Sequence, residues 1–100
     1  MRYRADANQN EIVSQLRDCG VSVEVLSQVG KAFPDLLVGF RGKNYLMEVK
    51  GEDGELSADQ VKWHFEWNGQ VCVVRTFGEA LAVLEDGTAI ELISQALKGE

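Results

Sequence analysis

The sequence has few of the residues on which several protein classes depend. Its 100 residues include two cysteines, one histidine and one proline. Cys19 and Cys72 give neither a disulfide framework nor the spacing of a zinc site, so we interpret both as reduced thiols. No apolar run approaches the ~20 residues that span a bilayer, and residues 1–11 lack the apolar stretch of a signal peptide. We therefore expect an intracellular protein that does not associate with membranes.

Basic residues are scarce, and the net charge of -6 disfavours a nucleic-acid partner at first sight. The charge is unevenly distributed, however. Residues 1–50 hold seven Lys/Arg and six Asp/Glu, whereas residues 51–100 hold three and ten. The first half therefore retains a candidate phosphate-binding rim, for which the alternative is a scatter of solvated surface charges. The residues of this rim are Lys31, Arg41, Lys43 and Lys50.

Periodicity divides the chain into predicted helices and strands. Helices are expected at residues 8–18, 56–68, 76–85 and 88–97. Strands are expected at residues 21–26, 35–40, 44–50 and 70–75. This order predicts an α/β domain with a mixed sheet (α+β), in which helices cover a small central sheet. The length allows one domain over residues 1–100 and not two, with a core at about 8–85 and a C-terminal helix at 88–98.

Polar residues at fixed spacing mark the expected helix ends. Asn8 is followed three residues later by Glu11, and Ser57 is followed three residues later by Gln60. Both pairs match a capping box, in which each side chain satisfies the other residue's backbone N–H. Gly20 is expected to end the first helix.

Three charged side chains fall in a predicted hairpin, PDLLVGFRGKNYLMEVK, at residues 34–50. A two-residue turn at 41–42 places Asp35 opposite Glu48, and strand alternation puts Lys50 on the face of Glu48. Opposed carboxylates destabilise a strand pair and resist joint ionisation. A divalent cation that prefers hard oxygen ligands, such as Mg²⁺ or Mn²⁺, offsets this repulsion. The alternative is that Asp35 caps a strand end while Glu48 pairs with Lys50 in solvent.

The order of these motifs resembles that of a known nuclease superfamily. The pattern is Glu11, Gly30, Pro34-Asp35, Glu48-Val49-Lys50, Leu56-Ser57 and Gln60, and it resembles the PD-(D/E)XK nucleases. The stretch KGEDGELSADQ is similar to the VRR-NUC type of domain, a branch with small stand-alone phage and bacterial proteins that resemble Holliday-junction resolvases. The resemblance spans roughly residues 8–80 and implies a restriction-endonuclease-like core. It also implies a Mg²⁺- or Mn²⁺-dependent deoxyribonuclease acting on branched or nicked DNA in a bacterial or phage-infected cell.

The resemblance further implies a role for each matching residue. Asp35 and Glu48 become metal-binding carboxylates, with the Val49 carbonyl as a further ligand, and Lys50 contacts the attacking water or the scissile phosphate. The two remaining site residues, Glu11 and Gln60, are expected to complete the acidic cluster and to add a polar group from the second helix. Both have an alternative role as capping-box residues. We expect the two roles to conflict, because a side chain folded back on its own helix reaches a metal less easily.

The aromatic residues leave two interpretations open. Trp63 and Trp67 are one helical turn apart, while Val61 and Phe65 lie on another side of the same helix. A helix that is apolar on two sides indicates burial against the sheet and against a partner subunit or an unstacked base; intrachain packing is the alternative. His64 has no second imidazole for a metal cluster, so we expect it to be structural.

Two further expectations concern partners. The C-terminal helix at 88–98 either covers the sheet or pairs with a twofold mate, and a homodimer would suit two symmetric nicks. The acidic second half of the chain leaves few phosphate contacts. This keeps two alternatives to a self-sufficient nuclease: a nucleic-acid-binding module without cleavage, and a nuclease that needs a partner such as a helicase.

Overall fold

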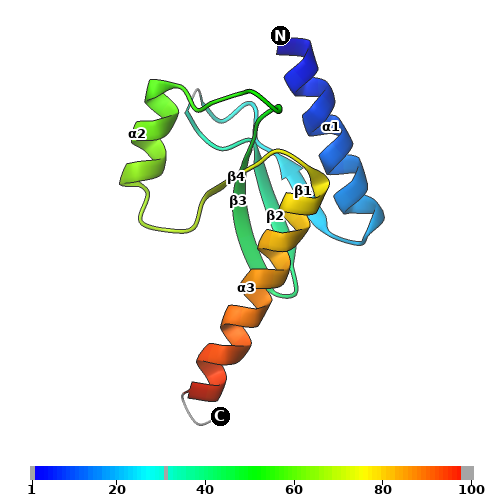
Figure 1. The fold of residues 1–100 in the computed structure, drawn as a ribbon, viewed down its shortest axis with the longest axis vertical. Helices are drawn as coiled ribbons and strands as arrows, with labels where there is room; N and C mark the ends of the chain where they lie inside the picture. Colours follow the sequence, from blue (N-terminus) through cyan, green and yellow to red (C-terminus); the bar gives the residue numbers. More distant parts are fainter. Residues whose placement is uncertain (1, 31, 98–100) are drawn as a thin grey trace.

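The computed structural model describes residues 2–30 and 32–97, and the side chains of residues 7–30 and 32–87. The chain forms one sheet with three helices around it (Figure 1). The strand order is β1-β2-β3-β4, antiparallel except for the parallel pair of β3 and β4. The predicted mixed α and β class is confirmed. The elements are α1 (Arg2–Asp18), β1 (Ser22–Val25), β2 (Leu36–Phe40), β3 (Lys43–Val49), α2 (Ala58–Glu66), β4 (Cys72–Val74) and α3 (Phe77–Leu97).

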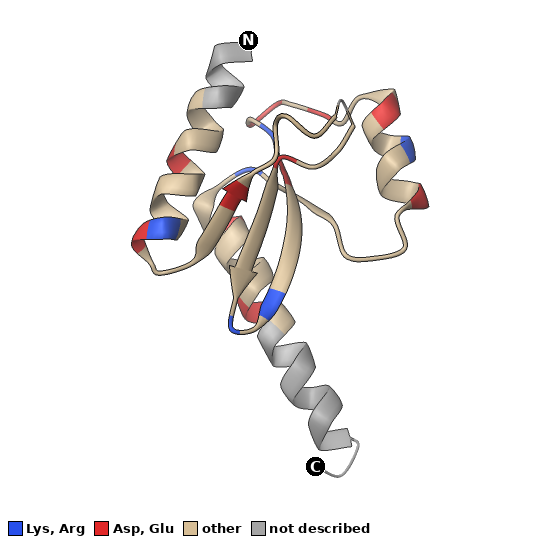
Figure 2. Cartoon of the chain, turned by 180° about the vertical axis from the view of Figure 1, so that it is seen from behind, with Lys and Arg blue, Asp and Glu red and all other residues tan. Residues whose placement is uncertain are grey.

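One face of the sheet carries the hydrophobic core. Helices α1 and α3 contact each other and cover this face (Figures 1 and 2). Alternate residues of each strand point into it, as the strand period of two requires. The buried residues are Ile12, Val13, Leu16, Val21, Val23, Leu36, Val38, Tyr45, Met47, Val49, Val74, Ala80 and Leu84.

The hairpin of β2 and β3 has the predicted register. Arg41 and Gly42 both have positive φ angles, 53° and 80°, which is the backbone of a two-residue turn whose twist matches that of the strands. Leu36 pairs with Met47, so Asp35, one residue before β2, lies across from Glu48. The two carboxylates therefore meet on the face of the sheet opposite the core.

Among the helices of the described residues, α2 is the one that approaches this opposite face. Ser57 caps the helix, and its capping box with Gln60 is confirmed. No residue of α2 is fully buried, and the helix stands away from the strands in Figure 1. The Gln70 side chain bonds both the N–H and the C=O of Leu46, at 2.7 and 3.1 Å, and so extends the pairing of β3 and β4. The sheet face beside α2 is left partly open.

Two predicted helix boundaries are wrong. Helix α1 begins at Arg2 rather than at Asn8, because the residues before Asn8 carry no apolar stripe that periodicity could detect. The two helices predicted at 76–85 and 88–97 form the single helix α3. The predicted end of α1 is confirmed, since Gly20 has a φ of 82° and its N–H bonds the C=O of Arg17.

Gly87 explains why α3 continues where the sequence indicates a break. A Cβ at this position would overlap the Tyr45 ring, with Cε2 at 2.8 Å and Cζ at 2.9 Å. The glycine therefore allows α3 to pack closely on the sheet and does not end the helix.

Within residues 2–30 and 32–97, no helix is both long and apolar enough to cross a bilayer.

Candidate active site

Asp35 is fixed at the start of β2 by backbone hydrogen bonds. Its C=O accepts from the Leu26 N–H at 2.7 Å, and its Oδ2 accepts from the Val49 N–H at 2.8 Å. The second bond crosses from β2 to β3 and holds the carboxylate over the end of β3. The Asp35 side chain therefore has a defined position beside the last residues of that strand.

Glu48 is a buried carboxylate with one unpartnered oxygen. Its side chain is 2% exposed. Oε2 accepts a hydrogen bond from Gln60 Nε2 at 3.1 Å and lies 3.4 Å from Lys50 Nζ, whereas Oε1 has no partner among the described residues. Burial, followed by the neighbouring Asp35 carboxyl, raises the pKa of Glu48 to about 7, against the opposing effect of Lys50. The site is short of positive charge.

Gln60 joins the second helix to these groups. Its Oε1 accepts from the Ser57 N–H and from Lys50 Nζ, both at 2.9 Å, while its Nε2 donates to Glu48. The capping role of Gln60 therefore does not prevent its contact with Glu48. An amide has a separate acceptor and donor, so the oxygen completes the cap while the nitrogen reaches the carboxylate.

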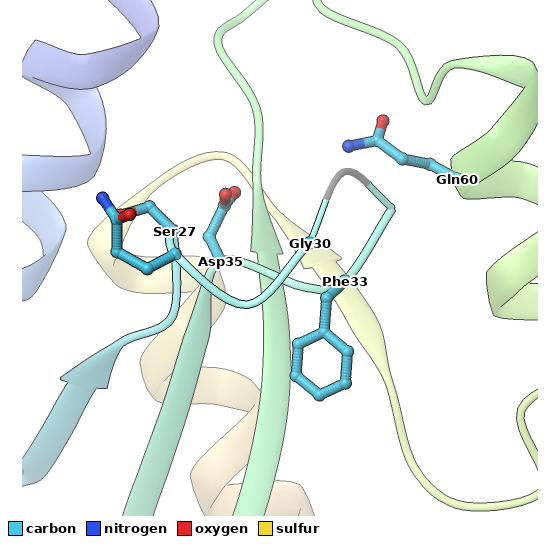
Figure 3. A pocket seen from close by; sticks show the side chains of 6 residues that line it. Ser27, Gly30, Phe33, Asp35 and Gln60 are labelled. Atoms are coloured by element: carbon cyan, nitrogen blue, oxygen red, sulfur yellow. The ribbon is translucent and has the colours of Figure 1, made fainter.

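The space in front of Asp35 and Gln60 is a cavity of about 390 Å³. In Figure 3 the Asp35 carboxylate and the Gln60 amide extend toward this space from β2 and from α2. The loop between β1 and β2 supplies much of the remaining wall. Its contributing residues are Ser27, Gln28, Gly30 and Phe33.

The other predicted site residues lie elsewhere. Glu11 is exposed on α1, and no group of three His, Cys, Asp or Glu side chains within the described residues could hold an ion. Among the described side chains, Glu11 is therefore not grouped with Asp35 and Glu48. Lys31 lies outside the described residues. Arg41 and Lys43 lie at the β2–β3 turn, where basic residues colour the ribbon in Figure 2.

Two residues that the sequence analysis did not assign to the site hold its backbone. Asn8 Nδ2 donates to the C=O groups of Lys50 and Arg75, at 3.0 and 3.2 Å. Arg75 Nη1 donates to the C=O groups of Gly51 and Gly54, which fixes the loop that follows Lys50. The sequence patterns predict a helix cap at Asn8 and the end of a strand at Arg75. No local signal distinguishes these roles.

Aromatic rings of α2 pack beside the site. Trp63 and Trp67 stack with centroids 4.7 Å apart, and Phe33 meets Trp63 edge-on at 5.2 Å. His64 lies one turn after Gln60, and its Nε2 is buried with no partner in the described part of the chain. Burial, and then Lys50, lower the pKa of His64, so the imidazole is neutral at pH 7.

Comparison with known proteins bears on this geometry. No family model matches the chain, and no curated protein matches it. A solved structure described as a VRR_NUC domain does match, with a TM-score of 0.64, 28% sequence identity, and coverage of 81% of this chain and 94% of that chain. The chain has the VRR-NUC fold. The predicted resemblance and fold class are thereby confirmed, and the VRR-NUC domain is a nuclease-type domain.

The donor set of the candidate site fits a divalent cation. Asp35 and Glu48 offer the hard carboxylate oxygens that Mg²⁺ and Mn²⁺ prefer, and the buried, unpartnered Glu48 Oε1 is an available ligand. Two carboxylates are sufficient, because Mg²⁺ sites commonly take their remaining ligands from water, backbone carbonyls and substrate phosphates. A bound cation would also offset the burial and repulsion that raise the pKa of Glu48.

Proposed function

We propose that this VRR-NUC domain is a divalent-metal-dependent DNA endonuclease that hydrolyses phosphodiester bonds in branched or nicked duplexes, such as Holliday junctions. One observation chiefly supports the proposal: the unpartnered oxygen of Glu48 is buried beside the Asp35 carboxyl. Lys50 Nζ lies 3.4 Å from the other Glu48 oxygen. Two acids at one edge of a sheet can hold a divalent cation, and an ammonium group beside them can stabilise negative charge on a phosphate.

Each side chain has a distinct role in the proposed reaction. Asp35, Glu48 and the Val49 carbonyl would hold a Mg²⁺ or Mn²⁺ ion. When bound, the ion supplies Lewis-acid stabilisation of the negative charge on the phosphate. Lys50 has three N–H donors, of which Gln60 and Glu48 engage two, so the third remains for a phosphate oxygen or the attacking water. Gln60 orients both neighbours.

The β2–β3 turn extends this site toward a longer stretch of DNA. Lys43 and Glu48 are the first and sixth residues of β3, so about 17 Å separates them along the strand. The exposed Arg41 and the half-buried Lys43 are therefore candidates to contact phosphates several nucleotides from the cut. Symmetric cleavage of a junction would further require a homodimer. The candidate contact is the C-terminal part of α3, which was predicted as a helix at 88–98 and whose side chains from residue 88 on lie outside the described residues.

A cleavage assay with a panel of labelled substrates tests this function. We expect cleavage of four-way junctions, flaps or nicked duplexes in Mg²⁺ or Mn²⁺, and none in EDTA. Asp35→Asn and Lys50→Ala should each lower the rate by about 100-fold or more. The matched controls are Asp59→Asn and Lys62→Ala, which change exposed residues of α2 and should retain the rate. Calorimetry should also show weaker Mn²⁺ binding to Asp35→Asn.

One observation favours a second candidate function. The chain has a net charge of -6, which disfavours association with a polyanion and is expected of a module that binds or cuts DNA only with a partner such as a helicase. Binding of junction DNA without cleavage by the purified chain, in either metal, would favour this candidate and overturn the first. Efficient cleavage by the purified chain would exclude it.

A further inference from the structure

An apolar groove of about 480 Å³ lies next to the candidate active site. Its walls include Val29, Leu37, Leu46 and Trp67, and none of the residues that line it is charged. Val29, Leu37 and Trp67 are 58%, 36% and 43% exposed. Exposed apolar side chains gathered in one concave surface commonly mark a binding site. The absence of charge indicates a neutral, apolar occupant.

The groove is continuous with the candidate active site. Phe33 lines both the groove and the cavity in front of Asp35, and in Figure 3 its ring points away from the Asp35 carboxylate, along the sheet. Leu46 lies two residues before Glu48 on the same face of β3, a separation of about 7 Å. One nucleotide spans such a separation between its phosphate and its base.

The groove also contains a preformed aromatic surface. Trp67 is stacked on Trp63 at 4.7 Å with an angle of 16° between the rings. Gly69 leaves room for the Trp67 ring, since a Cβ at that residue would lie 2.9 Å from the Trp67 Nε1. The exposed Asn44 stands at the rim and offers an amide to the edge of a base. A flat, uncharged ring with polar edges matches these features.

We propose that this groove binds an unstacked nucleobase adjacent to the scissile phosphate, with Trp67 as the stacking surface. The inference rests on the proposed function, because the active site supplies the phosphate position. A base in an intact duplex must first be unpaired and unstacked at a cost of a few kcal/mol, whereas a base at a branch, flap or single-stranded end is already free. Base binding is thus a physical source of selectivity for branched DNA.

The two tryptophans of the chain both lie in this stack, so their fluorescence reports on the groove directly. In EDTA, where no cleavage occurs, a single-stranded oligothymidylate of about eight nucleotides should quench the emission saturably. An abasic oligomer of equal length should bind about tenfold more weakly. Equal affinity for the two oligomers, measured by anisotropy of labelled strands, would overturn the inference.

Variants of α2 and of the residue that follows it separate the groove from the outer surface. Trp67→Leu keeps apolar volume but removes the stacking surface, and should remove most of the preference for bases. Phe65→Ala changes an 89% exposed residue of α2 outside the groove and should leave the preference for bases unchanged. An equal loss in both variants, with unchanged circular dichroism, would contradict the assignment.

These experiments distinguish failure of the base-binding groove from failure of the proposed nuclease activity. Base-dependent binding without cleavage in Mg²⁺ or Mn²⁺ would support base binding in the groove and contradict the proposed endonuclease activity. Metal-dependent cleavage with no effect of base removal or of Trp67→Leu would support the endonuclease activity and contradict base binding in the groove.

Discussion

Gln60 Nε2 donates a hydrogen bond of 3.1 Å to Glu48 Oε2 and thereby joins the first turn of α2 to a buried carboxylate of β3. Helix α2 makes few other contacts with the sheet face, and none of its residues is fully buried. This one side chain therefore couples the position of α2 to the charged groups of the site. Its capping and site roles can be separated by mutation.

Gln60→Ala should lower activity, whereas Ser57→Ala should not. Both variants remove half of the capping box and should lower the free energy of unfolding by about 1 kcal/mol. Only Gln60→Ala also releases Glu48 and Lys50, so it should reduce the cleavage rate by about 10–100-fold. Urea unfolding and cleavage rates at saturating metal measure the two effects. Equal activities in the two variants would mean that Gln60 acts only as a cap.

Glu48 should make the metal-free protein less stable as the pH rises. Its pKa is about 7 in the folded protein, against an ordinary value of 4.5, so the folded state binds more protons than the unfolded chain between these values. The free energy of unfolding should therefore fall with rising pH across this window, by about 3 kcal/mol in total.

The isosteric variant Glu48→Gln provides the reference for this measurement. It cannot ionise, so its stability in EDTA should lack this decline. Denaturant unfolding of both proteins at a series of pH values isolates the contribution of Glu48. Parallel curves for the two proteins would contradict the raised pKa.

Asn8 should act as a positioning residue for Lys50. Asn8→Ala removes the donor shared by the C=O groups of Lys50 and Arg75 and should cost about 1–2 kcal/mol of stability. Because it loosens the ends of β3 and β4, it should also lower the cleavage rate of the folded protein. Asn10→Ala changes an exposed residue of α1 and should alter stability by less than about 0.5 kcal/mol. Indistinguishable unfolding curves for the two variants would contradict the role of Asn8.

Gly87→Ala should destabilise the protein even though alanine favours helices. The added Cβ would meet the Tyr45 ring, and overpacking of this kind costs about 1–3 kcal/mol. Gly78→Ala, in the same helix, would meet only Thr76 Oγ1 at 3.8 Å and should be neutral or stabilising by up to about 1 kcal/mol. Thermal unfolding compares the two. A harmless Gly87→Ala would mean that α3 does not pack continuously on Tyr45.

Local rules predicted most elements but not their tertiary partners. Asn8 followed by Glu11 satisfies the pattern of a capping box. In the structure, however, Asn8 contacts Lys50 and Arg75, which lie 42 and 67 positions later in the sequence. The sequence similarly predicts two helices separated at residues 86–87, yet Gly87 lies within α3 beside the Tyr45 ring. In both cases the residue type is compatible with a local role and a tertiary one, and only packing decides between them.

The sequence by itself determined that Asp35 and Glu48 would oppose each other, because a two-residue turn and the strand period of two fix the register over a short separation. It likewise determined the start of α2 through Ser57 and Gln60. Only the tertiary structure decided that Gln60 reaches Glu48, that Glu11 stays outside the acidic pair, and that Trp67 borders an open groove. These outcomes depend on how helices pack against the sheet, and residues distant in the sequence set that packing.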